Sequence, residues 1–112
     1  MSDDERRALG LLGLGAKAGR IAIGVEAAHS ALRAGKAEAI VMPADASPRS
    51  KEQLVALAGH KKVPLFTFSQ AEKLGAALGR PAVHGVAVLD RQLAKGLKSY
   101  AVAHELKEKA AG

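Results

Sequence analysis

With 112 residues, the chain is long enough to form one domain with a buried core. Its 17 Lys and Arg residues exceed its 11 Asp and Glu residues and give a net charge of +6, which in a small domain favours a polyanionic partner, above all RNA or DNA. The lack of cysteine excludes disulfides, thiolate metal sites and cysteine nucleophiles, and it fits a reducing cytoplasm.

The hydropathy pattern indicates no membrane partner. No stretch approaches the roughly 20 apolar residues that span a bilayer, and the opening run MSDDERR lacks the charged-then-apolar order of a signal peptide. We therefore expect a soluble, cytoplasmic protein.

The first element expected along the chain is a helix from Asp3 to Lys17. Ser2 followed by Glu5 matches the capping box, in which each side chain accepts a hydrogen bond from a free N–H group at the start of a helix. Gly19 is expected to end this helix, because a glycine commonly follows the last helical residue.

The next stretch predicts a strand, a helix and a second strand. The strand from Arg20 to Ile23 ends at Gly24, which permits a sharp turn into a helix from about Val25 to Ala34. Gly35 is placed to end that helix, and the apolar run from Ala39 to Met42 is typical of a strand covered on both faces.

The alternation of helices and strands continues towards the C-terminus. Ser47 and Pro48 are expected to start a third helix, which ends around residues 59–62 and precedes a strand from Val63 to Phe68. Ser69 and Glu72 match a second capping box.

The last two elements are a strand from Val86 to Leu89 and a helix that Asp90 is expected to cap. The tail HELKEKAAG is expected to form the frayed end of this helix.

This order predicts an α/β fold: a three-layer α/β/α sandwich with a four-stranded mixed sheet, formed by one domain over residues 1–112. Because helices connect successive strands, we expect mainly parallel pairing; for the short first strand, both directions of pairing stay open.

Residues suited to catalysis or metal binding do not gather in this sequence. The four histidines belong to separate elements without the i, i+4 pairing of a helical metal site. Asp45 is expected to stabilise a loop, and Asp90 is explained as a helix cap. A G-x-G-x-x-A run in the first helix lacks the preceding strand that a dinucleotide site requires. We expect no enzyme, no cofactor, no metal and no small-molecule substrate.

Features suited to binding are more numerous. The turn at Gly24–Glu26 presents backbone N–H groups that have no partner within the helix, and in a basic protein it predicts a contact with a phosphate or a base. Long cations are expected near one rim of the sheet or in flanking loops, where they suit phosphate contacts; the alternative is a scatter of solvated charges. They are Lys17, Arg20, Arg33, Lys36 and Arg80.

Ala82, Val83 and His84 form a small apolar loop before the last strand. Two interpretations of this loop stand: it packs under flipped-out bases, or it covers the end of the sheet. Aromatic residues make up only 3% of the chain, which disfavours stacking of single-stranded bases and favours a structured RNA read by its backbone shape.

Three runs of the sequence together resemble a known family. They are AGRIAIGVEAAHSALRAGKAEAIVMPADAS, KVPLFTFSQAEKLGAALGR and VAVLD. They look like the ribosomal L7Ae/L30e superfamily, and most of all its bacterial YlxQ-like branch, with a resemblance that covers roughly Leu9 to Leu97. The resemblance implies an α/β/α sandwich and RNA binding, in the best-known members to kink-turns.

Residues that the resemblance implicates in RNA contact lie after the first strand and before the last strand. They are Gly24, Val25, Glu26, Ala27 and Ser30, with Ala82, Val83 and His84 in the loop. The kink-turn readers of the superfamily carry Asn-Glu after the glycine motif and a Lys one turn later. Here those positions hold Glu26, Ala27 and Ser30, so a carboxylate replaces an amide and a cation is missing.

The sequence therefore predicts a non-enzymatic protein that binds structured, kink-turn-like RNA, with rRNA, the ribosome and transcription or translation factors as candidate partners. The alternative is a protein–protein interaction module of the same fold, which the missing Asn-Glu-Lys pattern favours. A third interpretation, the RNA-substrate domain of a methyltransferase, would need a catalytic domain that this chain lacks.

Overall fold

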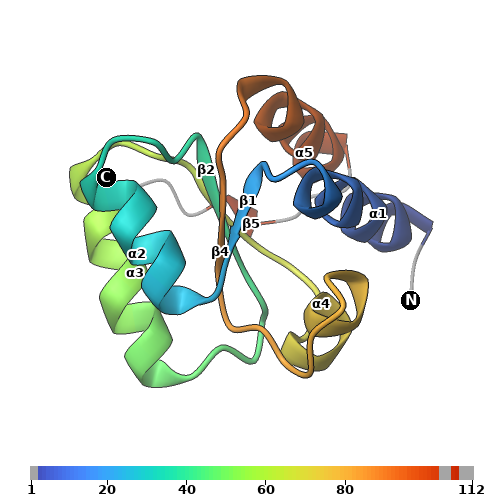
Figure 1. Cartoon of the computed structure of the whole chain (residues 1–112), viewed down its shortest axis with the longest axis horizontal. Helices are drawn as coiled ribbons and strands as arrows, with labels where there is room; N and C mark the ends of the chain where they lie inside the picture. Colours follow the sequence, from blue (N-terminus) through green and yellow to red (C-terminus); the bar gives the residue numbers. More distant parts are fainter. Residues whose placement is uncertain (1–2, 104–106, 109–112) are drawn as a thin grey trace.

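The computed structural model describes residues 3–103 and 107–108, and Figure 1 shows their arrangement. The elements, in chain order, are α1 (Asp3–Lys17), β1 (Ile21–Ile23), α2 (Val25–Arg33), β2 (Ala39–Met42), α3 (Pro48–His60), β3 (Leu65–Thr67), α4 (Ala71–Ala77), β4 (Val86–Val88), α5 (Arg91–Ala103) and β5 (Lys107–Glu108). No helix in the described part of the chain is long and apolar enough to cross a membrane.

The sheet lies between two layers of helices, as predicted (Figure 1). One core joins α1, α4 and α5 to one face of the sheet through side chains such as Leu12, Leu74 and Leu97. The other core joins α2 and α3 to the opposite face through side chains such as Leu32 and Leu54. Because successive residues of a strand point to opposite faces, each of β1, β2, β3 and β4 contributes to both cores of this α/β/α sandwich.

The strand order is β1-β4-β2-β3-β5, and the sheet is mixed as predicted. The expectation of mainly parallel pairing is wrong: β2 and β3 are parallel, whereas β4 is antiparallel to both β1 and β2. The physical reason lies in the loop after α4, which runs back along that helix: the Arg80 N–H donates to the Gly75 carbonyl oxygen, and the Val83 N–H donates to that of Ala71, the first residue of α4. The loop thereby returns the chain to the end of the sheet where β3 finished. The chain therefore enters β4 from that end.

The two-residue strand β5 pairs antiparallel with β3. The prediction that the tail HELKEKAAG forms the frayed end of the last helix is wrong for Lys107 and Glu108, and the other residues of that tail lie outside the described range. The capping box expected at Ser2 involves a residue outside the described range.

Local signals in the sequence correctly predict most helix ends. Gly24 has a φ of +104°, a conformation that L side chains rarely adopt, and it gives the sharp turn into α2. The Ser47 hydroxyl accepts a hydrogen bond from the Ser50 N–H at 3.1 Å. Asp90 Oδ1 accepts from the Leu93 N–H at 3.0 Å.

The start of α4 differs from the prediction. Ser69 has a φ of +65° and precedes the N-cap residue Gln70, whose side chain makes no capping hydrogen bond. The predicted capping box of Ser69 and Glu72 is therefore wrong. Instead, Asp45 Oδ1 accepts from the Ala71 N–H at 2.8 Å, so the loop after β2 caps a helix that begins 26 residues later.

We predict that Asp45→Ala destabilises the fold by about 1 kcal/mol, because the Ala71 N–H loses its acceptor at a partly buried helix start. Asp45→Asn keeps an acceptor oxygen and should retain most of the stability. Urea unfolding of the two variants measures the difference, and equal losses would show that the capping bond contributes nothing.

Candidate nucleic-acid interface

The first turn of α2 and the loop before β4 meet at one end of the sheet. Because β1 pairs with β4, with Ile23 opposite Val86, the residues that follow β1 adjoin the residues that precede β4. The Gly24 N–H donates to the Gly85 carbonyl oxygen at 2.9 Å and joins the two segments. We call residues 23–25 and 80–85 the corner.

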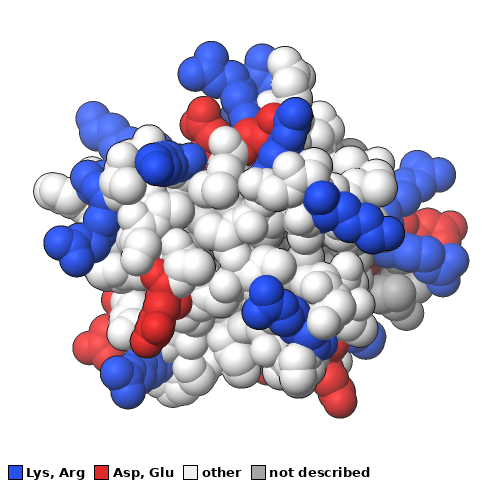
Figure 2. Space-filling view, viewed as in Figure 1, with Lys and Arg blue, Asp and Glu red and all other residues white. Residues whose placement is uncertain are grey.

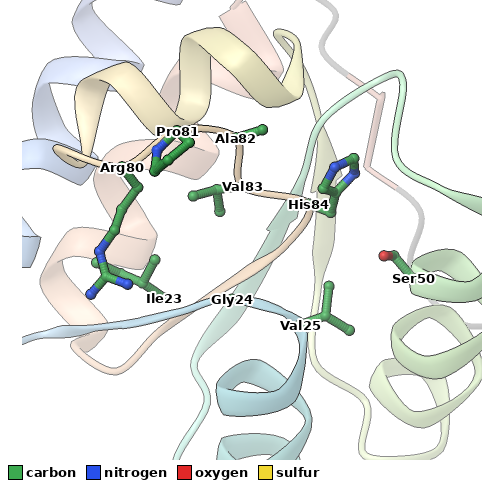
Figure 3. Close-up of a pocket in the computed structure, with 9 residues that line it drawn as sticks. All are labelled: Ile23, Gly24, Val25, Ser50, Arg80, Pro81, Ala82, Val83 and His84. Atoms are coloured by element: carbon green, nitrogen blue, oxygen red, sulfur yellow. The ribbon is translucent and has the colours of Figure 1, made fainter.

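The corner encloses an open hollow of about 320 Å³. Its lining residues are Ile23, Gly24, Val25, Ser50, Arg80, Pro81, Ala82, Val83 and His84. Figure 3 shows that the Arg80 side chain extends towards Ile23 and that His84 lies on the side facing Ser50. An apolar hollow edged by a guanidinium, an imidazole and backbone groups can accept a base edge or a sugar beside a phosphate.

The loop at residues 80–85 is held by backbone hydrogen bonds to α4. The Arg80 N–H donates to the Gly75 carbonyl oxygen at 2.8 Å, and the Val83 N–H donates to the Ala71 carbonyl oxygen at 3.0 Å. Val83 is 5% exposed and packs into the core, whereas Ala82 is exposed. Val83 therefore covers the end of the sheet, which is one of the two interpretations of this loop, whereas Ala82 is accessible to a ligand.

Gly75 permits the close approach of this loop to α4. A Cβ atom at this position would overlap the Pro81 carbonyl oxygen and lie 2.8 Å from that of Arg80. The loop therefore has its observed position only because residue 75 has no side chain.

His84 has a polar atom without a partner. Its Nδ1 is buried and has no hydrogen-bond partner among the described residues, although the side chain as a whole is half-buried. The Ser50 hydroxyl, by contrast, is engaged with Ser47 Oγ at 2.8 Å. The hollow is also lined by three residues that were not predicted as site residues: Ile23, Ser50 and Pro81. Ile23 and Pro81 adjoin predicted residues in the sequence, whereas no local pattern shows that Ser50, at the start of α3, faces this loop.

The structure brings together one group of the predicted site residues. Gly24, Val25, Ala82, Val83 and His84 line the hollow. Glu26, Ala27 and Ser30 follow on the first turns of α2, with Glu26 and Ser30 exposed and Ala27 half-buried.

The predicted cations are divided between the two ends of the sheet. Arg80 lines the hollow. Arg33 and Lys36 lie at the other end of α2, which is about 13 Å long, and Arg20 precedes β1 at that same far end. Lys17, at the end of α1, lies close by, since the Arg20 N–H bonds the Gly15 carbonyl oxygen. Lys17, Arg20, Arg33 and Lys36 therefore lie near one end of the sheet, but it is the end opposite Gly24.

Arg20 is engaged in an ion pair at this far end. Its guanidinium contacts the Asp90 carboxylate. The pKa of Asp90 lies below its ordinary value, chiefly because the Leu93 N–H donates to the carboxylate, with the charge of Arg20 adding to the effect. Arg20 thus has a structural partner in the protein.

Metal binding has no support within the described residues, where no group of three His, Asp or Glu side chains is close enough to hold an ion.

The fold and the corner together define an α/β/α sandwich with a candidate binding face at one sheet end. Residues 7–103 match the ribosomal protein L7Ae/L30e/S12e/Gadd45 family, and the chain belongs to this family. A comparison with curated proteins finds no match.

Two solved structures are similar to this chain. A Bacillus halodurans C protein of unknown function has 26% sequence identity and a TM-score of 0.79, over 83% of this chain and 94% of that one. The Giardia lamblia 15.5kD RNA binding protein has 22% identity and a TM-score of 0.77, over 94% of this chain and 90% of that one. The second likeness shows a shared fold.

We predict opposite effects of alanine at two helical glycines. Gly75→Ala should destabilise the protein by about 1–3 kcal/mol, because the new Cβ displaces the loop backbone. Gly10→Ala is the matched control: nothing lies within 4 Å of its Cβ, so the better helix former should stabilise α1 by about 0.5–1 kcal/mol. Thermal or urea unfolding measures both changes, and a neutral Gly75→Ala would contradict the close approach.

We also predict that the Asp90 carboxyl titrates below its ordinary pKa of about 3.9. The carboxylate then stabilises the fold above that pH, and its contribution is lost as the pH falls through the lowered pKa. Arg20→Gln should raise the pKa of Asp90 only part of the way, because the Leu93 N–H remains. Carbon-detected NMR titration measures both values, and an unshifted Asp90 in the wild type would disagree with this geometry.

Proposed function

We propose that this chain is a non-catalytic, single-domain RNA-binding protein that holds structured RNA at the corner. The observation that carries the proposal is the hydrogen bond from Gly24 to Gly85, which fixes the start of α2 and the loop at residues 80–85 around one hollow.

The start of α2 supports an anionic or polar ligand. The Ala28 N–H donates to the Gly24 carbonyl oxygen, so the N–H groups that precede Ala28 in α2 lie at the positive end of the helix dipole. Gly24 offers no side chain to cap them. Arg80 lines the same hollow and supplies a cation with the planar geometry that suits phosphate.

The similarity to known proteins also supports an RNA partner. The matching family is named for ribosomal proteins, and a solved structure with the same fold is an RNA binding protein. In the kink-turn readers that the sequence resembles, RNA contacts come from the turn after the first strand and the loop before the last one, which are the two segments of the corner.

We further propose a bent or kinked RNA helix as the ligand, with weaker binding than that of the kink-turn readers. Glu26 repels a nearby phosphate, and Ser30 supplies no cation. The proposal also includes membership of the YlxQ-like branch and a cytoplasmic location. It further includes association with rRNA, the ribosome or transcription and translation factors.

The second candidate function is a protein–protein interaction module. The same replacements at Glu26, Ala27 and Ser30 favour it, because they remove the side chains with which the kink-turn readers contact RNA. Recovery of partners from cells with and without nuclease treatment separates the two functions: protein partners that survive complete RNA removal support the interaction module.

We predict that Ala82→Glu lowers the affinity for folded RNAs by at least about tenfold, because it adds a carboxylate at the exposed tip of the loop. Ala56→Glu is the matched control, since it makes the same change at an exposed position of α3 that does not line the hollow. Arg80→Gln should weaken RNA binding and reduce the slope of log K against log salt by about one unit, because one phosphate contact is lost.

The measurement is a salt series of binding curves against a panel of folded RNAs that includes a kink-turn. Equal losses for Ala82→Glu and Ala56→Glu would show a general charge effect and would remove the corner from the proposal.

A further inference from the structure

The positive charge of the protein is concentrated away from the corner. In the described residues, seven cations lie at the other end of the sheet or on the helix ends beside it: Lys17, Arg20, Arg33, Lys36, Lys61, Lys62 and Arg91. The carboxylates of Glu38 and Asp90 lie at the same end. They form ion pairs with Arg91, at 3.7 Å, and with Arg20.

Four of these cations form a distinct surface where α2 and α3 end. We call Arg33, Lys36, Lys61 and Lys62 the basic end. All four are exposed, and no carboxylate of the described residues lies within 4 Å of their charged nitrogens. Figure 1 shows α2 and α3 running side by side, and Lys61 Nζ lies 3.5 Å from the Arg33 carbonyl oxygen, so the two helix ends are adjacent.

A second hollow of about 320 Å³ lies at this basic end. Its lining residues are Leu32, Gly35, Ala37, Glu38, Lys61, Lys62, Val63 and Pro64. Figure 2 shows Lys and Arg side chains at several places on the viewed face, including its upper left, where α2 and α3 end in Figure 1.

Lys62 occupies a left-handed position after α3 where the ends of α1, α2 and α4 have glycine. Gly19, Gly35 and Gly79 follow α1, α2 and α4 with a φ of +72°, whereas Lys62 follows α3 with a φ of +58°. The Lys62 N–H bonds the Gly59 carbonyl oxygen at 3.0 Å, and the Val63 N–H bonds that of Ala58 at 2.9 Å, which is the hydrogen-bonded turn that normally holds glycine. A lysine at this position costs conformational energy that glycine would avoid.

We propose that the basic end is a second RNA-binding surface, which contacts phosphates of the RNA backbone. Attraction to helix dipoles explains a cation in the last turn of a helix but not a strained lysine beyond it. The partner is a nucleic acid and not an acidic protein, because protein interfaces depend on buried apolar or aromatic anchors. Neither large exposed apolar side chain of the described residues, Leu14 or Val55, lines this hollow.

The two surfaces lie far enough apart to contact different parts of one RNA. They are separated by the length of α2, about 13 Å, on a molecule that measures 32 × 28 × 27 Å. The corner then holds one segment, and the basic end contacts the phosphates of another. The inference rests on the proposed function for the chemical nature of the partner but not for the location of the surface.

The test compares two double variants with the same loss of charge. Lys61→Gln/Lys62→Gln removes two cations of the basic end, and Arg6→Gln/Arg7→Gln removes two exposed cations near the start of α1. With a folded RNA that the wild type binds, the first variant should lose about tenfold in affinity at 100 mM salt and about two units in the slope of log K against log salt. The control should change little.

A third variant excludes misfolding as the cause. Lys62→Gly removes one of the charges and relieves the strained backbone, so it should raise the melting temperature by a few degrees while it lowers affinity and reduces the salt slope by about one unit.

Equal changes in the two double variants would overturn the inference. So would a partner from cells that survives nuclease treatment and is lost in Lys61→Gln/Lys62→Gln, since it would assign this surface to a protein. Ala82→Glu separates the two claims: if it alone abolishes binding, the corner stands and the basic end fails. If only the basic-end variants weaken binding, the reverse holds.

Discussion

The hydrogen bond from the Gly24 N–H to the Gly85 carbonyl oxygen is the constraint on which the candidate site depends. Gly24, with a φ of +104°, turns the chain into α2 directly after this bond. Gly85 lies close to α3: a Cβ there would lie 2.6 Å from Leu54 Cδ1, so the buried Leu54 side chain would have to shift. The bond fixes two segments, 61 residues apart in sequence, around one hollow.

Support for the corner comes from parts of the chain that do not line it. Asp45 caps α4, α4 holds the loop at residues 80–85 through backbone hydrogen bonds, and Gly75 allows the loop to approach. A rigid surface loses little conformational entropy when a ligand binds, which favours affinity from few contacts. This matters for a site whose hollow contains the single arginine Arg80.

Local sequence patterns predict the elements better than they predict their neighbours. The glycine turn at Gly24 and the caps at Ser47 and Asp90 each involve residues within a few positions, and the structure confirms them. The bond between Asp45 and Ala71 and the place of β4 between β1 and β2 depend on long-range packing, so no local pattern shows them. The separation of Arg33 from the corner has a similar cause: Gly24 and Arg33 lie at opposite ends of α2, so residues close in the sequence lie at different ends of the sheet.

The central claim is that the corner is where RNA contacts this member of the L7Ae/L30e/S12e/Gadd45 family. Amide chemical shifts of the labelled protein, followed during titration with a folded RNA, test it most directly. The account predicts the largest changes at residues 24–30 and 80–84, with a second and more salt-sensitive group at residues 33–36 and 61–62. Unchanged shifts at residues 24–30 and 80–84 in a protein saturated with RNA would contradict it.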